Sequence, residues 1–199
     1  MARYTGPKDR LSRRENFDLF GKGSKLTRLG TLPGMHGPKG LLKVSQYGKQ
    51  LREKQKVKRM YGIMERQFEN YVTEAFKVRG NTAEKIFSFL EKRLDNVVYR
   101  LGFAPTRMAA RQLVSHRHVL VNGKRLNIPS YQIQVGETVS LSTKSAEIPH
   151  IKKTLEVEDQ KIPTWLSRKA IVGKINREPK IEDSVEPISM LDIVEFYSR

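Results

Sequence analysis

The sequence contains no cysteine among its 199 residues. This absence excludes disulfides, cysteine-ligated zinc, iron–sulfur clusters and a thiol nucleophile. Long apolar segments are also lacking, since no uninterrupted apolar run exceeds three residues, and we expect no membrane-spanning helix. The first residues, Met1 to Thr5, lack the apolar stretch of a secreted precursor, so we expect a cytoplasmic protein.

Acidic residues are scarce relative to basic ones. The chain has 38 Lys+Arg against 21 Asp+Glu, a net charge of +17. Counted along the sequence, the excess is +8 in residues 1–50, +5 in 51–100, +4 in 101–150 and 0 in 151–199. Charge of this size repels itself, which predicts an acidic polymer or surface as partner. The neutral last quarter indicates that this contact ends before residue 151.

Residues 1–44 are predicted to form a basic N-terminal extension. Glycines and prolines between Gly30 and Gly40 exclude a regular helix or strand there. A disordered arm or an organellar transit peptide is one interpretation. Scattered apolar residues such as Leu11, Phe17 and Leu19 favour the other, a segment that is ordered by its partner.

A helical pattern begins near Ser45. Apolar residues recur at steps of three and four through Val57, Met60, Tyr61, Met64, Phe68, Tyr71, Val72 and Ala75. Gly62 lies within this stripe, where the helix is expected to kink or break. Between 52 and 59 the only acid is Glu53 among many cations, which favours phosphate binding over a solvated, salt-bridged face.

A second helical region starts near Asn81, with Glu84 three residues later as a capping box. Its apolar stripe is predicted to be core. The stripe comprises Ile86, Phe87, Leu90, Leu94, Val97, Val98 and Leu101.

Residues 105–141 predict a short helix followed by a β-hairpin. Thr106 is the expected N-cap, and Arg107, Arg111 and Ser115 share the outward side of the helix. Asn122-Gly123 is the strongest short hairpin signal. Further strands are expected from the alternation of apolar residues at 131–135 and at 139–141.

Cations are placed at the start and end of this helix and at the hairpin tip. We expect Arg107, Arg111, Arg117, Lys124 and Arg125 to line one concave rim. Such a rim suits the backbone phosphates of structured RNA, whose deep major groove side chains cannot easily read. A solvated basic surface is the alternative, but Glu137 is the only acid between 96 and 146, which favours RNA.

The same region resembles a known RNA-binding module. The stretches Arg93–Ala104 with Thr106-Arg107, Ala110–His116 with His118, Val121-Asn122-Gly123 and Ile128–Tyr131 are similar to the module named after small-subunit ribosomal protein four. That module also occurs in pseudouridine synthases, tyrosyl-tRNA synthetases and a heat-shock ribosome-binding protein. By itself it therefore leaves an RNA-modifying enzyme and a tRNA or stalled-ribosome factor open.

The rest of the chain resembles the bacterial-type family of small-subunit ribosomal protein four. The similar segments are Ala2–Lys8, Tyr47–Gly62, Glu65–Phe68, Pro163 with Trp165-Leu166, and the ending Glu195–Arg199. The resemblance implies an α+β protein with an N-terminal extension at 1–44. It further implies an all-α domain at 45–92 plus 184–199, and a mixed α/β RNA-binding domain at 93–183 with a helix–hairpin (alpha-L) motif and a small antiparallel sheet.

The resemblance also implies a function and partners. The expected protein is a non-enzymatic structural component of the bacterial small ribosomal subunit, in the cytoplasm. It would bind the 5′ domain junction of 16S rRNA, nucleate assembly, and lie near the entrance of the mRNA channel with small-subunit proteins five and three. A role in translational accuracy is implied as well. No cofactor and no small-molecule substrate are expected.

Composition, pattern and resemblance together predict the contact residues. Those for rRNA are Arg3, Lys8, Arg10, Arg13, Arg14, Lys49, Arg52, Lys54, Lys56, Lys58, Arg59, Thr106, Arg107, Arg111, Gln112, Ser115, His116, Arg117, Asn122, Lys124 and Arg125. Glu195, Phe196 and Tyr197 are expected to contact a protein. If about ten phosphates are neutralised, the log–log salt slope of binding would be about −7 to −9.

Two departures from the family pattern stand out. Many relatives carry a cysteine-based zinc knuckle that begins near the positions of Asp9 and Ser12, whereas this chain has no cysteine. We therefore expect no metal in the extension, whose order would come from RNA contact and leucine packing. Arg117 stands where small or flexible residues are common, and is expected to restrict the turn.

Overall fold

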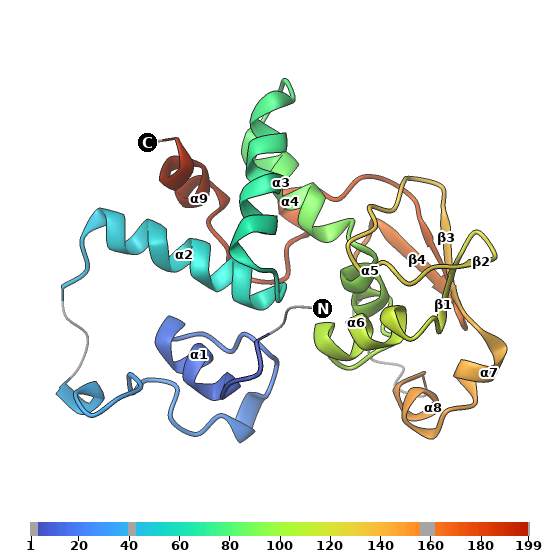
Figure 1. Ribbon diagram of the computed structural model, residues 1–199, viewed down its shortest axis with the longest axis horizontal. Helices are drawn as coiled ribbons and strands as arrows, with labels where there is room; N and C mark the ends of the chain where they lie inside the picture. Colours follow the sequence, from blue (N-terminus) through green and yellow to red (C-terminus); the bar gives the residue numbers. More distant parts are fainter. Residues whose placement is uncertain (1–3, 40–42, 156–161, 199) are drawn as a thin grey trace. The chain divides into compact units, whose positions relative to one another are not determined.

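The computed structural model describes residues 4–39, 43–155 and 162–198 (Figure 1). Arg3 of the predicted rRNA contacts lies outside these residues. The helices are α1 (Lys8–Glu15), α2 (Gln46–Met60), α3 (Glu65–Lys77), α4 (Thr82–Glu91), α5 (Leu94–Arg100), α6 (Arg107–Ser115), α7 (Thr143–Ala146), α8 (Pro149–Leu155) and α9 (Met190–Tyr197). The 3-10 turns are η1 (Gly23–Lys25), η2 (Gly37–Lys39) and η3 (Ile181–Asp183). The strands are β1 (Val119–Val121), β2 (Lys124–Arg125), β3 (Thr138–Leu141), β4 (Leu166–Lys169) and β5 (Val172–Ile175).

The chain divides into two compact units. One comprises Met1–Ile86 with Glu186–Arg199, and the other comprises Phe87–Val185. The C-terminal segment thus groups with the helical part, and the N-terminal segment belongs to the same unit. The predicted domain boundaries near 44, 92 and 183 stay predictions. None of the helices in the described part of the chain is long and apolar enough to span a bilayer.

The first unit is built on the apolar stripe of α2 and α3. Val57, Met60, Phe68, Val72 and Ala75 are all buried, as the periodicity predicts. The stripe is interrupted at Gly62, whose φ of 62° ends α2. Residues 61–64 form the break between the two helices, and Met64, a member of the predicted stripe, is half-exposed because it precedes α3 as its N-cap.

Helix α9 packs against α2 (Figure 1). It begins at the N-cap Ser189, whose side chain accepts a hydrogen bond from Asp192 N at 3.4 Å. Met190 and Ile193 are buried on its inner side, whereas Leu191 is exposed. The C-terminal residues are therefore part of the core of the first unit.

The second unit packs α5 and α6 on one face of a five-stranded antiparallel sheet with strand order β2-β1-β3-β5-β4. Its core includes Val98, Phe103, Val114, Ile133 and the fully buried Trp165. The predicted capping of α6 is also confirmed, since Thr106 Oγ1 accepts a hydrogen bond from Ala109 N at 3.2 Å. The α+β class predicted from the sequence is confirmed by this architecture.

The hairpin prediction is confirmed, and one strand prediction is wrong. Asn122 and Gly123 have φ of 49° and 79° and connect β1 with β2 as a two-residue turn. Residues 131–135 form no strand, apart from one isolated bridge of Gln132 to Arg93. Their backbone instead forms hydrogen bonds with the segment before α5, in which Ile133 N donates to Lys92 O at 2.9 Å.

Candidate nucleic-acid interface

The N-terminal segment is held together by polar contacts within the chain. Arg13 donates to the carbonyls of Thr31 at 2.9 Å and Leu32 at 3.1 Å, which closes the glycine- and proline-rich loop. Asp9 pairs with Lys22, and buried Ser12 accepts a hydrogen bond from Leu19 N at 3.4 Å. No group of three His, Cys, Asp or Glu side chains in the part of the chain that the structure describes is arranged to hold a metal ion. Arg10 and Arg14 remain exposed on α1.

The basic helix α2 is not a uniformly cationic surface, because several of its cations form ion pairs. Arg52 and Arg59 both pair with Glu15 of α1, whose side chain is almost fully buried. Lys54 is itself buried and donates to Glu65 Oε1 at 2.7 Å, and Lys58 donates to Glu65 Oε2 at 2.6 Å. The counting of acids within 52–59 missed these partners because they come from other helices.

The two remaining cations of α2, Lys56 and Lys49, differ in whether they form an ion pair. Lys56 pairs with Glu53 at 3.4 Å and donates to the carbonyl of Pro187 at 2.5 Å, so it also fastens the C-terminal segment. Lys49 is exposed and makes no ion pair among the described residues.

The Glu65 carboxylate accepts hydrogen bonds from three side chains. Burial by itself would raise the pKa of its carboxyl group, but hydrogen bonds from Lys54, Lys58 and Tyr197 outweigh burial and lower the pKa to about 2. The bond from Tyr197 is 3.0 Å long, and burial together with the Glu65 charge raises the pKa of that phenol. This cluster links α2, α3 and α9.

The C-terminal residues predicted to contact another protein also contact this chain. Glu195 accepts a hydrogen bond from buried Gln50 at 2.6 Å. Phe196 stacks on Tyr47 with ring centroids 5.5 Å apart, and the Lys54 ammonium lies 4.3 Å from the Phe196 ring centroid. In the structure, these three residues attach α9 to the rest of the first unit.

Arg107 and Arg111 of α6 are only partly exposed, whereas the helical wheel predicted that both point outward. Arg111 donates to Asp95 Oδ2 through Nε at 2.8 Å and through Nη2 at 2.6 Å. Arg107 donates to Asn96 Oδ1 at 2.9 Å and lies over the Tyr99 ring, 4.7 Å from its centroid. Packing of α5 beside α6 brings these acceptors to the arginines, which spacing along one helix cannot reveal.

A buried polar network continues from these contacts through α4 and α5. Asp95 also accepts from Arg93 at 2.9 and 3.1 Å. Glu91 accepts from Arg100 at 2.8 and 3.0 Å and from Asn96 at 3.0 Å. Buried charges of this kind are stable only when they are paired, so Glu91 and Asp95 fix the helix arrangement beneath the rim.

Exposed cations gather instead at the C-terminal end of α6 and at the hairpin tip. Arg117, Lys124 and Arg125 are exposed and form no ion pair among the described residues. Gln112 and His116 are exposed beside them, whereas Ser115 is half-buried and donates to Arg111 O at 2.8 Å. Arg117, Lys124 and Arg125 together form the cationic tip, the part of the predicted rim that no ion pair among the described residues neutralises.

Asn122 and Glu137 hold the hairpin tip in place. Asn122 donates to Glu137 Oε1 at 3.0 Å and accepts a hydrogen bond from Thr138 N at 3.0 Å. Glu137 accepts further hydrogen bonds from Tyr131 OH at 3.2 Å and Gln134 N at 2.8 Å. The single acid of this region is thus occupied in shaping the tip.

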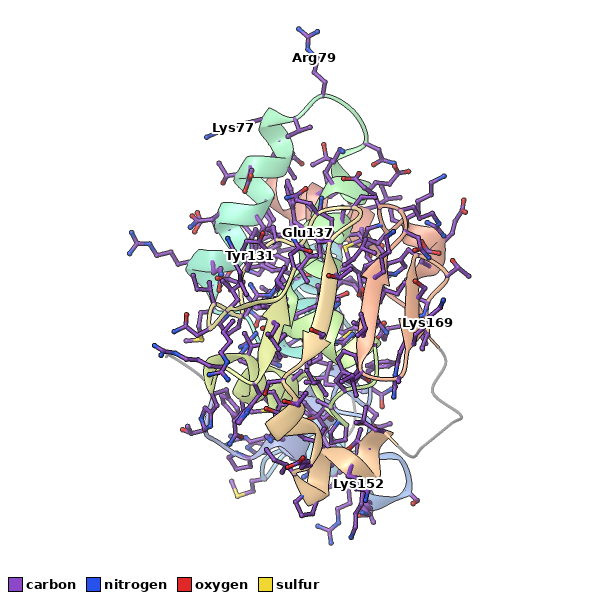
Figure 2. The ribbon with its side chains drawn as sticks, turned by 90° about the vertical axis from the view of Figure 1, so that its right-hand side faces the viewer. Lys77, Arg79, Tyr131, Glu137, Lys152 and Lys169 are labelled. Carbon is purple, nitrogen blue, oxygen red and sulfur yellow. The ribbon has the colours of Figure 1, made fainter. Side chains whose placement is uncertain are left out.

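Sequence reasoning missed cations outside the predicted set. Lys77 at the end of α3 and Arg79 in the turn after it project from the first unit, and Lys169 projects from the second unit (Figure 2). The zero net charge of 151–199 concealed Lys169, because acids of that segment form ion pairs with other residues. Asp183 binds Arg177 at 2.6 Å, and Glu178 binds Lys92 at 3.1 Å.

Comparison with known proteins identifies the class of this chain. The model of the ribosomal protein S4/S9 N-terminal domain matches residues 3–91, and that of the S4 domain matches residues 92–139. The second match covers α5, α6 and the β1–β2 hairpin, which form the site described above. The chain is therefore an S4-domain protein with an N-terminal part of ribosomal type.

Relatives of full length specify the family. Small ribosomal subunit protein uS4 of Listeria monocytogenes serovar 1/2a is 48% identical over 201 residues, with 100% of each chain covered. Small ribosomal subunit protein uS4 of Cupriavidus pinatubonensis is 48% identical over 207 residues, again with 100% of each chain covered. The chain belongs to the family of small ribosomal subunit protein uS4, as the resemblance predicted.

Proposed function

We propose that this protein is a structural component of the small ribosomal subunit that binds 16S rRNA. The observation that carries the proposal is the exposed cationic tip of the S4 domain, formed by Arg117, Lys124 and Arg125, in which the nearby acid Glu137 is already hydrogen-bonded. Cations without acidic neighbours suit phosphate contact, and structured RNA offers phosphates in a fixed arrangement. The full-length relatives, both small ribosomal subunit protein uS4, support the same function.

The finer roles belong to the same proposal. We propose that the protein binds the 5′ domain junction early and nucleates assembly, and that it acts near the entrance of the mRNA channel beside small-subunit proteins five and three. The exposed edges of Glu195, Phe196 and Tyr197 are our candidates for protein contact and for an influence on accuracy. Support comes from the family and from the charge distribution, in which α9 carries acids and no cation among its residues.

The mechanism is static. Cations hold several phosphate groups of an RNA junction together and neutralise their mutual repulsion, so the RNA stays in one fold. The buried Glu91 and Asp95 network keeps α5 and α6 rigid, so that the tip is positioned before RNA binds. We propose no catalytic step.

The decisive test is a charge reversal at the tip. Lys124→Glu with Arg125→Glu is expected to weaken binding to a 16S rRNA 5′-domain transcript steeply and to abolish co-sedimentation with small subunits at high salt. The matched control, Lys152→Glu with Lys153→Glu on α8, makes the same change of charge at exposed positions. Equal affinity of the tip variant and the unchanged protein would contradict the proposal.

Arg107 and Arg111 are unsuitable for that test. A glutamate at 111 would lie beside the Asp95 carboxylate, which is buried and already shared by Arg93. Loss of RNA binding in such a variant would report on the fold, because an unpaired buried charge is strongly destabilising.

A further inference from the structure

The sheet of the second unit has one closed face and one open face. Val119, Val139, Leu141 and Ile175 are buried toward the core that contains α5 and α6. Gly173 also belongs to this face, since a Cβ placed there would lie 2.4 Å from Leu101 Cδ1. The centre of the closed face is apolar and packed against the core, so no partner can reach it there.

Strand register assigns the residues of the open face. Directly opposed residues of antiparallel strands share a face, and the register pairs Ser167 with Lys174, Lys169 with Val172, and Leu120 with Arg125. Through β3, Thr138 pairs with Lys174 and Ser140 with Val172. The face turned to the viewer in Figure 2, away from α5 and α6, therefore carries three cations and three hydroxyl groups.

The charge of the open face is not neutralised by the strands themselves. Arg125, Lys169 and Lys174 are exposed and make no ion pair among the described residues. The five strands lie wholly within those residues and contain no Asp or Glu. Glu137 directly precedes β3, but its oxygens accept hydrogen bonds from Asn122, Tyr131 and Gln134.

We propose that this open sheet face, defined by Arg125, Lys169 and Lys174, is a second RNA-binding surface, which takes phosphates of the rRNA backbone. The inference rests on the proposed function and extends it from the tip across the sheet to its far edge, because β2 and β4 are the two edge strands. Lysine and arginine pair with phosphate, and the hydroxyl groups of Thr138, Ser140 and Ser167 suit phosphate and 2′-hydroxyl oxygens.

The composition of the face specifies the kind of contact. The described strand residues include no aromatic side chain, so bases have nothing to stack on. Contact is therefore with the backbone and independent of base sequence. The absence of aromatic anchors from these strands also disfavours a protein partner, since the centres of protein interfaces are rich in aromatic residues.

A charge-neutralising pair tests the contribution to binding. Lys169→Gln with Lys174→Gln is expected to make the log–log salt slope for the 16S rRNA 5′-domain transcript shallower by about 2, one per lost phosphate contact. The matched control is Lys152→Gln with Lys153→Gln on α8, which removes the same charge and is expected to leave the slope unchanged. An unchanged slope in the sheet variant, or an equal change in both variants, would overturn the proposal.

A tethered probe tests the location of the face. Because the chain has no cysteine, Ser167→Cys offers a single attachment point for an iron chelate that generates hydroxyl radicals. In small subunits reconstituted with this variant, we expect cleavage of 16S rRNA above the background of the cysteine-free protein. No such cleavage in subunits that contain the protein, or cross-linking of position 167 to a protein, would overturn the second surface alone. Failure of the unchanged protein to enter the subunits would instead contradict the proposed function.

Discussion

Arg117 combines an exposed charge with an unfavourable backbone conformation. It follows the C-cap His116 of α6 and has a φ of 63°. Arg117 N donates to Val114 O at 2.9 Å and His118 N donates to Leu113 O at 3.0 Å, the pattern of a Schellman motif. Glycine is the usual residue at this position because a Cβ there is strained. The restriction expected from the sequence thus has a local structural cause.

Substitution of Arg117 can separate strain from charge. Arg117→Gly and Arg117→Ala remove the same cation, but only glycine relieves the left-handed conformation. We expect the glycine variant to be about 0.5–1 kcal/mol more stable than the alanine variant in urea unfolding, with equally weakened binding to the rRNA transcript. Equal stability of the two variants would show that the turn stores no strain.

Glu65 makes the stability of the helical unit dependent on pH. Its lowered pKa, about 2 in the folded chain, means that folding favours the ionised carboxylate. This stabilisation is present in full above the pKa of the unfolded chain, near 4.3, and is lost as the pH falls toward 2. Since 43% of the Glu65 side chain is exposed, water screens the effect, and we expect about 1–2 kcal/mol.

The measurement is urea unfolding between pH 7 and pH 2 for the unchanged protein and for Glu65→Gln. The glutamine variant is expected to lack the loss between about pH 5 and pH 2 that this carboxylate causes. Glu74→Gln, which changes an exposed acid on the same helix, serves as the control and should retain that loss. Parallel curves for the unchanged protein and Glu65→Gln would contradict the assignment.

At the scale of whole elements, α9 is fastened to α2 by side chains from one side only. Ile193 and Met190 are buried, whereas Leu191 is 68% exposed on the other side. The Gln50–Glu195 hydrogen bond reinforces the contact with α2, and Tyr197 also donates a hydrogen bond to Glu65 of α3. The C-terminal helix is therefore a structural part of the first unit.

Two alanine substitutions on α9 should have very different effects. Ile193→Ala removes a fully buried side chain and is expected to lower the free energy of unfolding by about 2–5 kcal/mol. Leu191→Ala has the same type of change at an exposed position and is expected to stay within about 0.5 kcal/mol. Urea unfolding combined with amide hydrogen exchange in α2 measures both. Similar losses in the two variants would mean that α9 is not docked on α2.

Sequence patterns over a few residues predicted most helices and strands. The partners of most charged side chains, in contrast, depend on contacts between residues far apart in the sequence. The stripes of α2 to α5, the Thr106 cap and the Asn122-Gly123 turn depend on neighbours a few residues apart. In contrast, Arg59 meets Glu15 across 44 residues and Arg111 meets Asp95 across 16. Spacing along the chain does not reveal these pairs. This is why the helix cations were predicted to be available to phosphate.

At the scale of the whole molecule, the net charge of +17 overstates the charge available to RNA. Many cations of α2 are paired with acids of α1 and α3, and Arg107 and Arg111 of α6 are bound to residues of α5. Among the predicted rRNA contacts in the described residues, the exposed cations without an ion pair are Arg10, Arg14, Lys49, Arg117, Lys124 and Arg125. These six are the first candidates for phosphate contact.

This reduced set changes the expected salt dependence. Each phosphate contact contributes about 0.7–0.9 to the log–log slope, so six contacts give about −4 to −5, and the sheet-face residues Lys169 and Lys174 extend this to about −6 to −7. Binding of the 16S rRNA 5′-domain transcript across a salt series measures the slope directly. A slope of about −7 to −9, as composition alone had predicted, would require the ion-paired cations of α2 and α6 to exchange their carboxylate partners for phosphate. In that case Lys58→Gln should make the slope shallower by about 1, whereas no change is expected if Glu65 keeps this lysine.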